Sequence, residues 1–249
     1  MTRKRRASNS LNTIKTQRRT KKTLNLELLH KMHPLTSKQA DMFRSYEEGK
    51  NILAYGCAGT GKTHVILYNA LKDVLNERTP YDKILLFRST VQSLDIGFIP
   101  GTINEKIAPF ESPYRNMVKS MFDLETDEEF DMLYGLLKNE DIIDFQCVSF
   151  LRGETFDNCI MIVDECQNLN YHQLSSIITR VGQDTKIFFA GDSRQSDLNK
   201  LSEKNGFLEF TRVLKEMPSF ALIEFGIEDV VRSGLVKEFL VAEHKVLNS

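Results

Sequence analysis

The sequence has 249 residues, of which 41% are hydrophobic and 27% are charged. This balance is typical of a soluble protein with one full-sized α/β core and argues against a second independent core. No run of 18 apolar residues occurs, which argues against a membrane span, and no apolar h-region follows the basic N-terminus, which argues against a secretory signal. The cysteines make no CxxC pair and have no histidine at metal-ligand spacing, so we expect reduced, small apolar cysteines in a cytoplasmic protein: Cys57, Cys147, Cys159 and Cys166.

Residues 1–22 form a basic segment with nine lysines and arginines and no acidic residue. Because the whole chain has a net charge of -1, these nine cations leave -10 on the remainder. The segment lacks aromatic residues and is rich in Ser, Thr and Asn, so it cannot bury enough surface to fold alone. We predict a disordered basic arm. It contacts nucleic-acid phosphates or serves as a solubilising tail, and a nuclear localisation signal is a further alternative.

After this arm, residues 23–249 alternate helical patterns with short apolar runs, which predicts a single domain. Such runs, with little polar alternation, indicate strands buried on both faces of a mainly parallel sheet with helices on both sides. The predicted strands are 51–55, 83–87, a run within 141–148, 159–163, 185–190 and 219–225. The predicted helices are 24–32, 35–49 with Thr36 or Ser37 as N-cap, 62–76, 170–181 and 230–243. Residues 100–140 break the alternation with three prolines and an acidic helical stretch, and we interpret them as a helical insertion.

The most specific motif is the octapeptide GCAGTGKT, which follows the first predicted strand and opens the next helix. It satisfies the phosphate-loop pattern G-x-x-x-x-G-K-[ST], whose small residues let backbone N–H groups converge on an anion. The helix N-terminus adds a partial positive charge. We therefore predict that Lys62 reaches the outer phosphates, that the Thr63 hydroxyl ligates Mg²⁺, and that His64 lies at the nucleotide edge or the surface. The predicted nucleotide-binding residues are Gly56, Cys57, Ala58, Gly59, Thr60, Gly61, Lys62, Thr63 and His64.

A pair of acidic residues, Asp164 and Glu165, ends the apolar run 159–163. Strands of an open α/β sheet deliver their last residues to the edge where ligands bind. Asp164 is the predicted Mg²⁺ ligand, directly or through water, and Glu165 the base that orients and deprotonates the attacking water. Gln195 follows the next apolar strand in the stretch 191–195, GDSRQ, and is predicted to hydrogen-bond the γ-phosphate or the water.

Together these motifs resemble the motor core of superfamily 1 helicases. Three further stretches resemble the PhoH family of ATPases: FIPG at 98–101 with Glu105–Lys106 and Pro109–Phe110, FLRG at 150–153 with Thr155, and DVVR at 229–232. The resemblance covers roughly residues 34–243. It implies a RecA-like P-loop fold, and small PhoH-like chains suit a bacterium or a phage. Cys166, where the family usually has alanine, and Ser193–Arg194 depart from the family pattern.

The resemblance also implies roles for residues that the motifs alone do not assign. Gln39 occupies the position at which related helicases read adenine, which implies a preference for ATP. Arg232 corresponds to the arginine that stabilises transition-state charge, and Arg180 is a second candidate. Superfamily 1 helicases have two motor domains, and the second closes over the ATP. This chain is long enough for only one motor domain. We therefore expect a homo-oligomeric ring, a hexamer, in which a neighbour donates an arginine.

The predicted function is Mg²⁺-dependent ATP hydrolysis coupled to binding or remodelling of RNA or single-stranded DNA. A small-molecule P-loop kinase is an alternative, although the Asp164–Glu165 pair and Gln195 favour attack by water. A nucleotide-switched stress or assembly protein without a nucleic-acid substrate is the third possibility.

Overall fold

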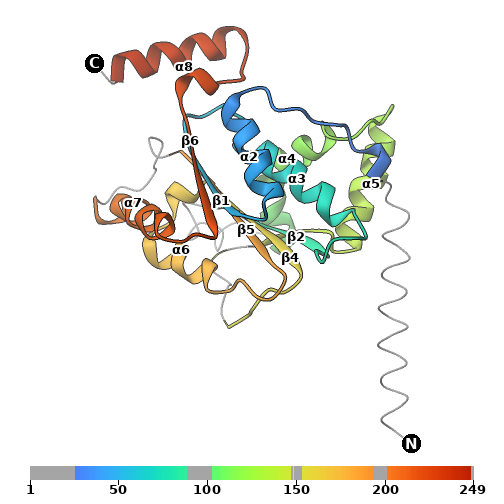
Figure 1. Ribbon diagram of the computed structural model, residues 1–249. Helices are drawn as coiled ribbons and strands as arrows, with labels where there is room; N and C mark the ends of the chain where they lie inside the picture. The colour runs from blue at the N-terminus through green and yellow to red at the C-terminus, as the bar shows by residue number, and fades with distance from the viewer. Residues whose placement is uncertain (1–25, 89–102, 147, 149–152, 193–200, 248–249) are drawn as a thin grey trace, which may run out of the picture.

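The computed structural model describes residues 26–88, 103–146, 148, 153–192 and 201–247. Its centre is a single sheet in the strand order β3-β2-β4-β5-β1-β6, in which every pair is parallel (Figure 1). This confirms the predicted α/β class with a parallel sheet. The strands are β1 (Asn51–Gly56), β2 (Lys83–Arg88), β3 (Ile143–Gln146), β4 (Cys159–Asp164), β5 (Lys186–Gly191) and β6 (Phe220–Phe225).

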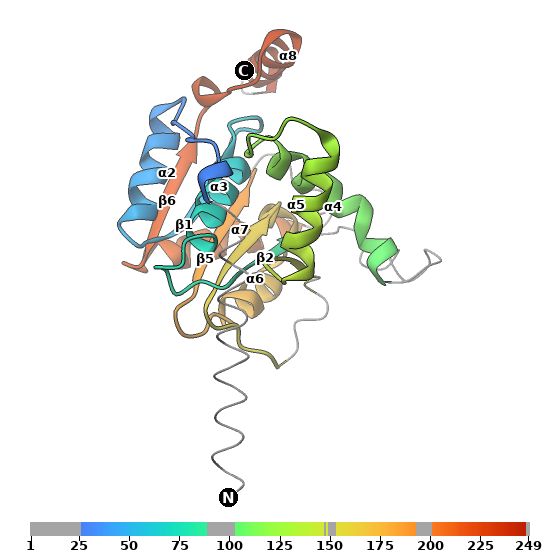
Figure 2. The same cartoon turned by 90° about the vertical axis from the view of Figure 1, so that its right-hand side faces the viewer.

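Helices cover both faces of the sheet, because successive strand residues point to opposite sides and both sides are apolar. In β1, Ile52 and Ala54 belong to one core while Leu53 belongs to the other. The first core is covered by α2 (Ser37–Glu47), α3 (Lys62–Val74), α4 (Ile103–Lys119) and α5 (Asp127–Asn139), and the second by α6 (Tyr171–Ile178) and α7 (Leu201–Lys215) (Figures 1 and 2).

The segment before α2 differs from the prediction. Only the short 3₁₀ helix η1 (Leu26–Leu28) forms in the described part of the region where a helix over 24–32 was expected. The backbone here is committed to another part of the chain: His30 N–H donates to the Met121 carbonyl, and Asp123 N–H donates to the Leu28 carbonyl. These long-range bonds replace the local bonds that a helix would need. The α2 helix itself begins as expected, with the Thr36 hydroxyl accepting from the Gln39 N–H.

Between β2 and β3 lie α4 and α5, within the region predicted as a helical insertion. Ion pairs join them, Arg115 to Asp131 and Lys119 to Asp127. The α5 helix begins with a capping box, in which Thr126 and Glu129 satisfy each other's backbone N–H groups. The acidic stretch therefore supplies a helix start and ion-pair partners for α4.

The C-terminal third contains one helix that the sequence did not predict and one that starts later than expected. The α7 helix has Gly206 inside it, which weakens a helical pattern. Its backbone passes so close to α6 that a Cβ at Gly206 would lie 2.6 Å from the Tyr171 nitrogen, so the glycine permits this crossing. The helix predicted over 230–243 is α8 (Gly234–Leu247), preceded by the 3₁₀ helix η4 (Ile227–Asp229).

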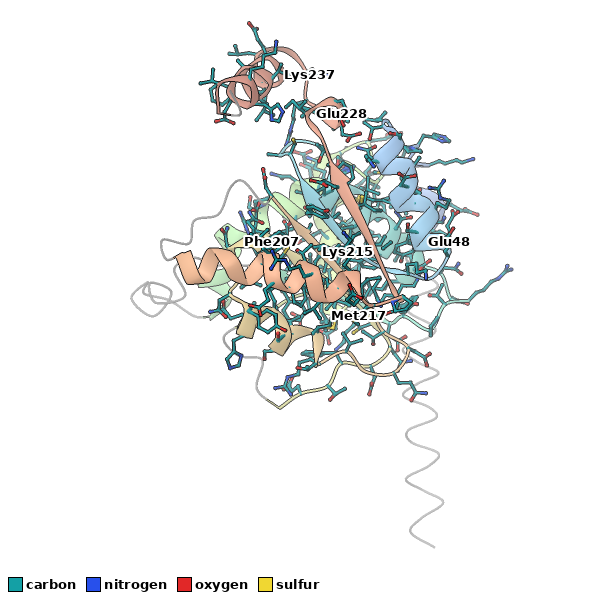
Figure 3. The ribbon with its side chains drawn as sticks, turned by 60° about the vertical axis from the view of Figure 1, so that its left-hand side comes forward. Glu48, Phe207, Lys215, Met217, Glu228 and Lys237 are labelled. Carbon is teal, nitrogen blue, oxygen red and sulfur yellow. The ribbon has the colours of Figure 1, made fainter. Side chains whose placement is uncertain are left out.

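In Figure 3, α8, with Lys237 labelled, projects from the body beyond Glu228 of η4, while α7, carrying Phe207 and Lys215, lies along the sheet. Large apolar side chains of α8 are exposed, among them Leu235, Val236 and Phe239. No helix in the described part of the chain is both long enough and apolar enough to cross a membrane.

Candidate nucleotide-binding and hydrolysis site

Three neighbouring strands end at the same edge of the sheet and bring the predicted motifs together. The strand β1 leads into the phosphate loop, β4 ends at Asp164, and β5 leads to Asp192. Since β4, β5 and β1 are adjacent and parallel, their carboxyl ends meet at one place. This is the edge at which open α/β sheets bind ligands.

The phosphate loop is fixed against the end of β6. Cys57 N–H donates to the Phe225 carbonyl at 3.0 Å. Gly56 has a φ of 112°, and a Cβ at this position would lie 2.2 Å from the same carbonyl oxygen. The glycine at the start of the motif is therefore required by this close backbone contact as well as by its left-handed conformation. Inside the loop, the Thr60 hydroxyl donates to the Cys57 carbonyl at 3.0 Å.

Lys62 lies within the curl of the loop and is only 9% exposed. Its Nζ donates to the Cys57 carbonyl at 2.6 Å and to the Gly56 carbonyl at 3.1 Å, and it stands 5.8 Å from the centre of the Phe225 ring. Burial lowers the pKa of this lysine, and the nearby carboxylates of Asp192 and Asp164 oppose that shift. A partly desolvated cation surrounded by loop carbonyls is well suited to exchange them for phosphate oxygens.

Thr63 and Asp164 meet directly, although 101 residues separate them in sequence. The Thr63 hydroxyl donates to Oδ1 of Asp164 at 2.7 Å, and the Tyr114 hydroxyl donates to Oδ2 at 2.7 Å. Burial, followed by the charge of Asp164, raises the pKa of Tyr114, so the phenol keeps its proton and acts as a donor. Tyr114 comes from α4, and no sequence motif marked it.

Glu165 follows Asp164 in a left-handed conformation, with φ 52° and ψ 38°. A residue other than glycine pays a steric penalty in this region, and such residues cluster at functional sites. The side-chain Nε2 of Gln167 donates to Oε2 of Glu165 at 2.7 Å and so holds the carboxylate. The side-chain Oε1 of Gln167 accepts from the Asp192 N–H at 3.0 Å. Gln167 thus links the end of β4 to the end of β5, a role that the sequence did not reveal.

Gln39 reaches the phosphate loop from α2. Its Nε2 donates to the Thr60 carbonyl at 2.9 Å, and its Oε1 accepts from the Leu35 N–H at 2.8 Å. The Gln39 side chain therefore joins the start of α2 to the phosphate loop. His64, on the first turn of α3, contacts the Ser120 hydroxyl at 3.2 Å, and burial lowers its pKa.

The segment after η4 closes over the loop. Val231 N–H donates to the Gly59 carbonyl at 3.1 Å. A Cβ at Gly59 would lie 2.9 Å from Cγ of Arg232 and 3.4 Å from Leu240 of α8. Arg232 is therefore placed beside the phosphate loop of its own chain.

The other predicted arginine lies elsewhere. The Arg180 carbonyl accepts from the N–H of Phe156, which precedes β4, so Arg180 lies at the opposite edge of the sheet from the phosphate loop. Its Nε is buried without a hydrogen-bond partner in the structure described. Gln195, residues 98–101 and residues 150–152 fall outside the described residues.

The oxygen atoms of Thr63 and Asp164 suit Mg²⁺, which takes few protein ligands and completes its shell with waters and phosphates. Within the described ranges, no group of three or more His, Cys, Asp or Glu side chains could hold a metal by itself. Two oxygen donors would leave the rest of a Mg²⁺ shell to waters and phosphate oxygens.

The amino-acid sequence matches a known family. The family model described as PhoH-like protein matches residues 31–243. The chain belongs to the PhoH family. This PhoH-like chain is 29% identical over 211 residues to the PhoH-like protein of Bacillus subtilis (strain 168), covering 84% of this chain and 63% of that protein. It is 31% identical over 206 residues to protein PhoH of Escherichia coli (strain K12), covering 82% and 56%. It spans less than two thirds of either relative's length.

The fold of this PhoH-like chain is also found among solved structures. The large terminase of a thermophilic bacteriophage aligns with a TM-score of 0.50 and 12% identity, covering 83% of this chain and 49% of that chain. A likeness at this identity concerns the fold alone. It agrees with the RecA-like P-loop architecture that the motifs predict.

Proposed function

We propose that this PhoH-like chain binds ATP with Mg²⁺, hydrolyses it, and couples hydrolysis to binding or remodelling of RNA or single-stranded DNA. The observation that carries the proposal is the meeting of Thr63, Asp164 and Glu165 beside the buried Lys62. Phosphoryl transfer depends mainly on positioning and on charge stabilisation, and these four side chains supply both.

In the proposed reaction, the phosphate loop binds the β- and γ-phosphates, and Lys62 exchanges its carbonyl partners for phosphate oxygens. Thr63 and Asp164 would hold Mg²⁺, which would neutralise charge on the phosphates. Glu165 accepts a proton from water as the water oxygen bonds to the γ-phosphorus. The bond to the bridging oxygen then breaks, leaving ADP and inorganic phosphate. Arg232 stabilises the developing charge, and Gln195 contacts the γ-phosphate.

Water as the acceptor is favoured over a small-molecule kinase reaction by the position of Glu165. Its carboxylate follows the metal-binding Asp164 directly and is held by Gln167. Gln39 contacts the loop that binds the phosphates, and we propose that it also favours adenine over other bases. The nucleic-acid partner is proposed from the helicase-like motifs and from the basic residues 1–22.

The test measures release of inorganic phosphate from ATP and Mg²⁺ with no acceptor, then with single-stranded RNA or DNA at low salt. Lys62→Ala should reduce phosphate release by at least about 100-fold, because it removes the charge that stabilises the transition state. Lys72→Ala, an exposed lysine on the same α3 helix, is the matched control and should retain the wild-type rate.

Removal of residues 1–22 should weaken nucleic-acid binding and its salt dependence, since the nine cations no longer displace counterions. Wild-type protein that releases phosphate equally with and without nucleic acid, and that fails to bind either strand at low salt, would contradict the nucleic-acid part. Protein that needs an acceptor to turn over ATP would instead support a kinase.

A further inference from the structure

Tyr114 stands out as a buried hydroxyl at the metal-binding carboxylate. It is 1% exposed, and it comes from α4 in the helical insertion rather than from any strand that ends at the site. Its hydroxyl donates to one oxygen of Asp164 while Thr63 donates to the other, both at 2.7 Å. Each oxygen of the Asp164 carboxylate thus accepts one hydrogen bond.

The ring that carries this hydroxyl is itself held in place. The Arg88 guanidinium lies 5.9 Å from the centre of the Tyr114 ring, and the Phe145 ring lies 5.6 Å away in a tilted arrangement. Arg88 is the last residue of β2 and stands opposite Asp164 in the sheet register. A ring packed against the ends of two strands cannot turn away without opening the core, so the position of its hydroxyl oxygen beside Asp164 is fixed.

We infer that Tyr114 is a positioning residue for Asp164, holding its carboxylate in the orientation that receives Mg²⁺ with the nucleotide; this inference rests on the proposed function. A carboxylate has about four lone-pair positions, so two donated hydrogen bonds leave others for a metal or its waters. A threonine hydroxyl can donate its proton to Asp164 and still offer a lone pair to the ion. Hydrogen bonds of this kind to ligating carboxylates orient them and affect metal affinity.

The helical insertion thus contributes a side chain to the site. Because Tyr114 belongs to α4, the orientation of Asp164 depends on α4 remaining docked. The α4 helix is tied to α5 by the Arg115–Asp131 and Lys119–Asp127 ion pairs and by the Tyr134 hydroxyl, which donates to Glu111 at 2.7 Å.

The test compares Tyr114→Phe with Tyr134→Phe in the full chain. Each variant removes one hydroxyl that donates to a carboxylate at 2.7 Å, and each keeps its ring, but only the first touches the metal site. The readout is Mn²⁺ binding by electron paramagnetic resonance with a non-hydrolysable ATP analogue present. Tyr114→Phe should weaken Mn²⁺ binding by about 10-fold, the lower end of what loss of such a supporting bond costs. Tyr134→Phe should leave it unchanged.

A second measurement separates positioning from general loosening. Binding of the same analogue without metal depends on the phosphate loop, so it should match wild type in both variants. Equal Mn²⁺ affinity in wild type and Tyr114→Phe would overturn the inference while leaving the proposed function intact. An equal loss in both tyrosine variants would also overturn it, in favour of a purely structural role. Wild-type protein that binds no Mn²⁺ with the analogue would overturn both proposals.

Discussion

At the scale of single residues, close backbone contacts and unusual backbone conformations constrain two positions of the site. Gly56 abuts the Phe225 carbonyl, and Glu165 keeps a left-handed conformation that costs roughly 1–3 kcal/mol in an ordinary residue. Gln167 and the neighbouring strand end hold Glu165 in that conformation. The same Gln167 contacts that offset the strain at Glu165 also orient its carboxylate.

The effect of the close contact at Gly56 on stability can be separated from the effect of its positive φ angle. Gly56→Ala should destabilise the fold by about 3 kcal/mol or more, because the new methyl group meets a backbone carbonyl as well as an unfavourable φ. Gly49→Ala is the matched control: Gly49 has a φ of 78° with nothing within 4 Å of an added Cβ, and we expect a loss of about 1 kcal/mol. Urea unfolding measures both, and equal losses would contradict the contact argument.

At the scale of elements, helix starts contribute differently to the site. The N-cap Thr36 begins α2 three residues before Gln39, which donates to the Thr60 carbonyl of the phosphate loop. The N-cap Thr126 begins α5, whose capping box holds only the insertion. The same chemical feature thus supports the phosphate loop through Gln39 in one place, and in the other the start of α5, which acts on the site only through α4 and Tyr114.

Replacement of either cap by alanine should lower the free energy of unfolding by about 1 kcal/mol. Thr36→Ala should in addition weaken metal-free nucleotide binding, because Gln39 then holds the phosphate loop less firmly, whereas Thr126→Ala should bind metal-free nucleotide as wild type does. Urea denaturation gives the stability, and fluorescence titration with a labelled ATP analogue gives the affinity. Identical affinities in the two variants would refute the link between α2 and the loop.

Elements with a strong local pattern could be predicted from the sequence, and those that depend on distant contacts could not. The apolar runs identified the inner strands β1, β2, β4 and β5 because these are buried on both faces, whereas the edge strands β3 and β6 are only partly buried. The expected helix over 24–32 is replaced because its backbone bonds to residues 121–123, and α7 was missed because Gly206 interrupts its pattern. In the site, Lys62, Thr63 and Asp164 lie in recognisable motifs, whereas Tyr114 reaches Asp164 across 50 residues of unrelated sequence.

At the scale of the whole molecule, α8 presents apolar side chains to solvent next to the phosphate loop. Leu235 and Phe239 are 79% and 60% exposed, and Leu240 on the same helix approaches Gly59. Exposed apolar surface of this kind favours association. We propose that copies of this chain assemble into a ring, and that a neighbour approaches the site from this side.

Light scattering with ATP and Mg²⁺ should show an oligomer, with a hexamer as the expected size. The double variant Leu235→Ser and Phe239→Ser should shift it toward monomer, because two apolar contacts are lost. Met132→Ser, which removes an equally exposed apolar side chain from α5, should leave the assembly intact. Wild-type protein that remains monomeric at all concentrations with nucleotide present would refute the ring.

The attachment of the phosphate loop to Phe225 and Val231 also bears on how the chain folds during synthesis. The loop leaves the ribosome early, but the carbonyl and the N–H group that fix it belong to residues made about 170 positions later. A domain generally folds as a unit, and contacts of long sequence separation cost more chain entropy to close than local ones. Nucleotide stabilises only a chain that can bind it. We therefore expect the proposed binding of ATP to stabilise a nascent chain only after β6 and the segment behind it have joined the sheet.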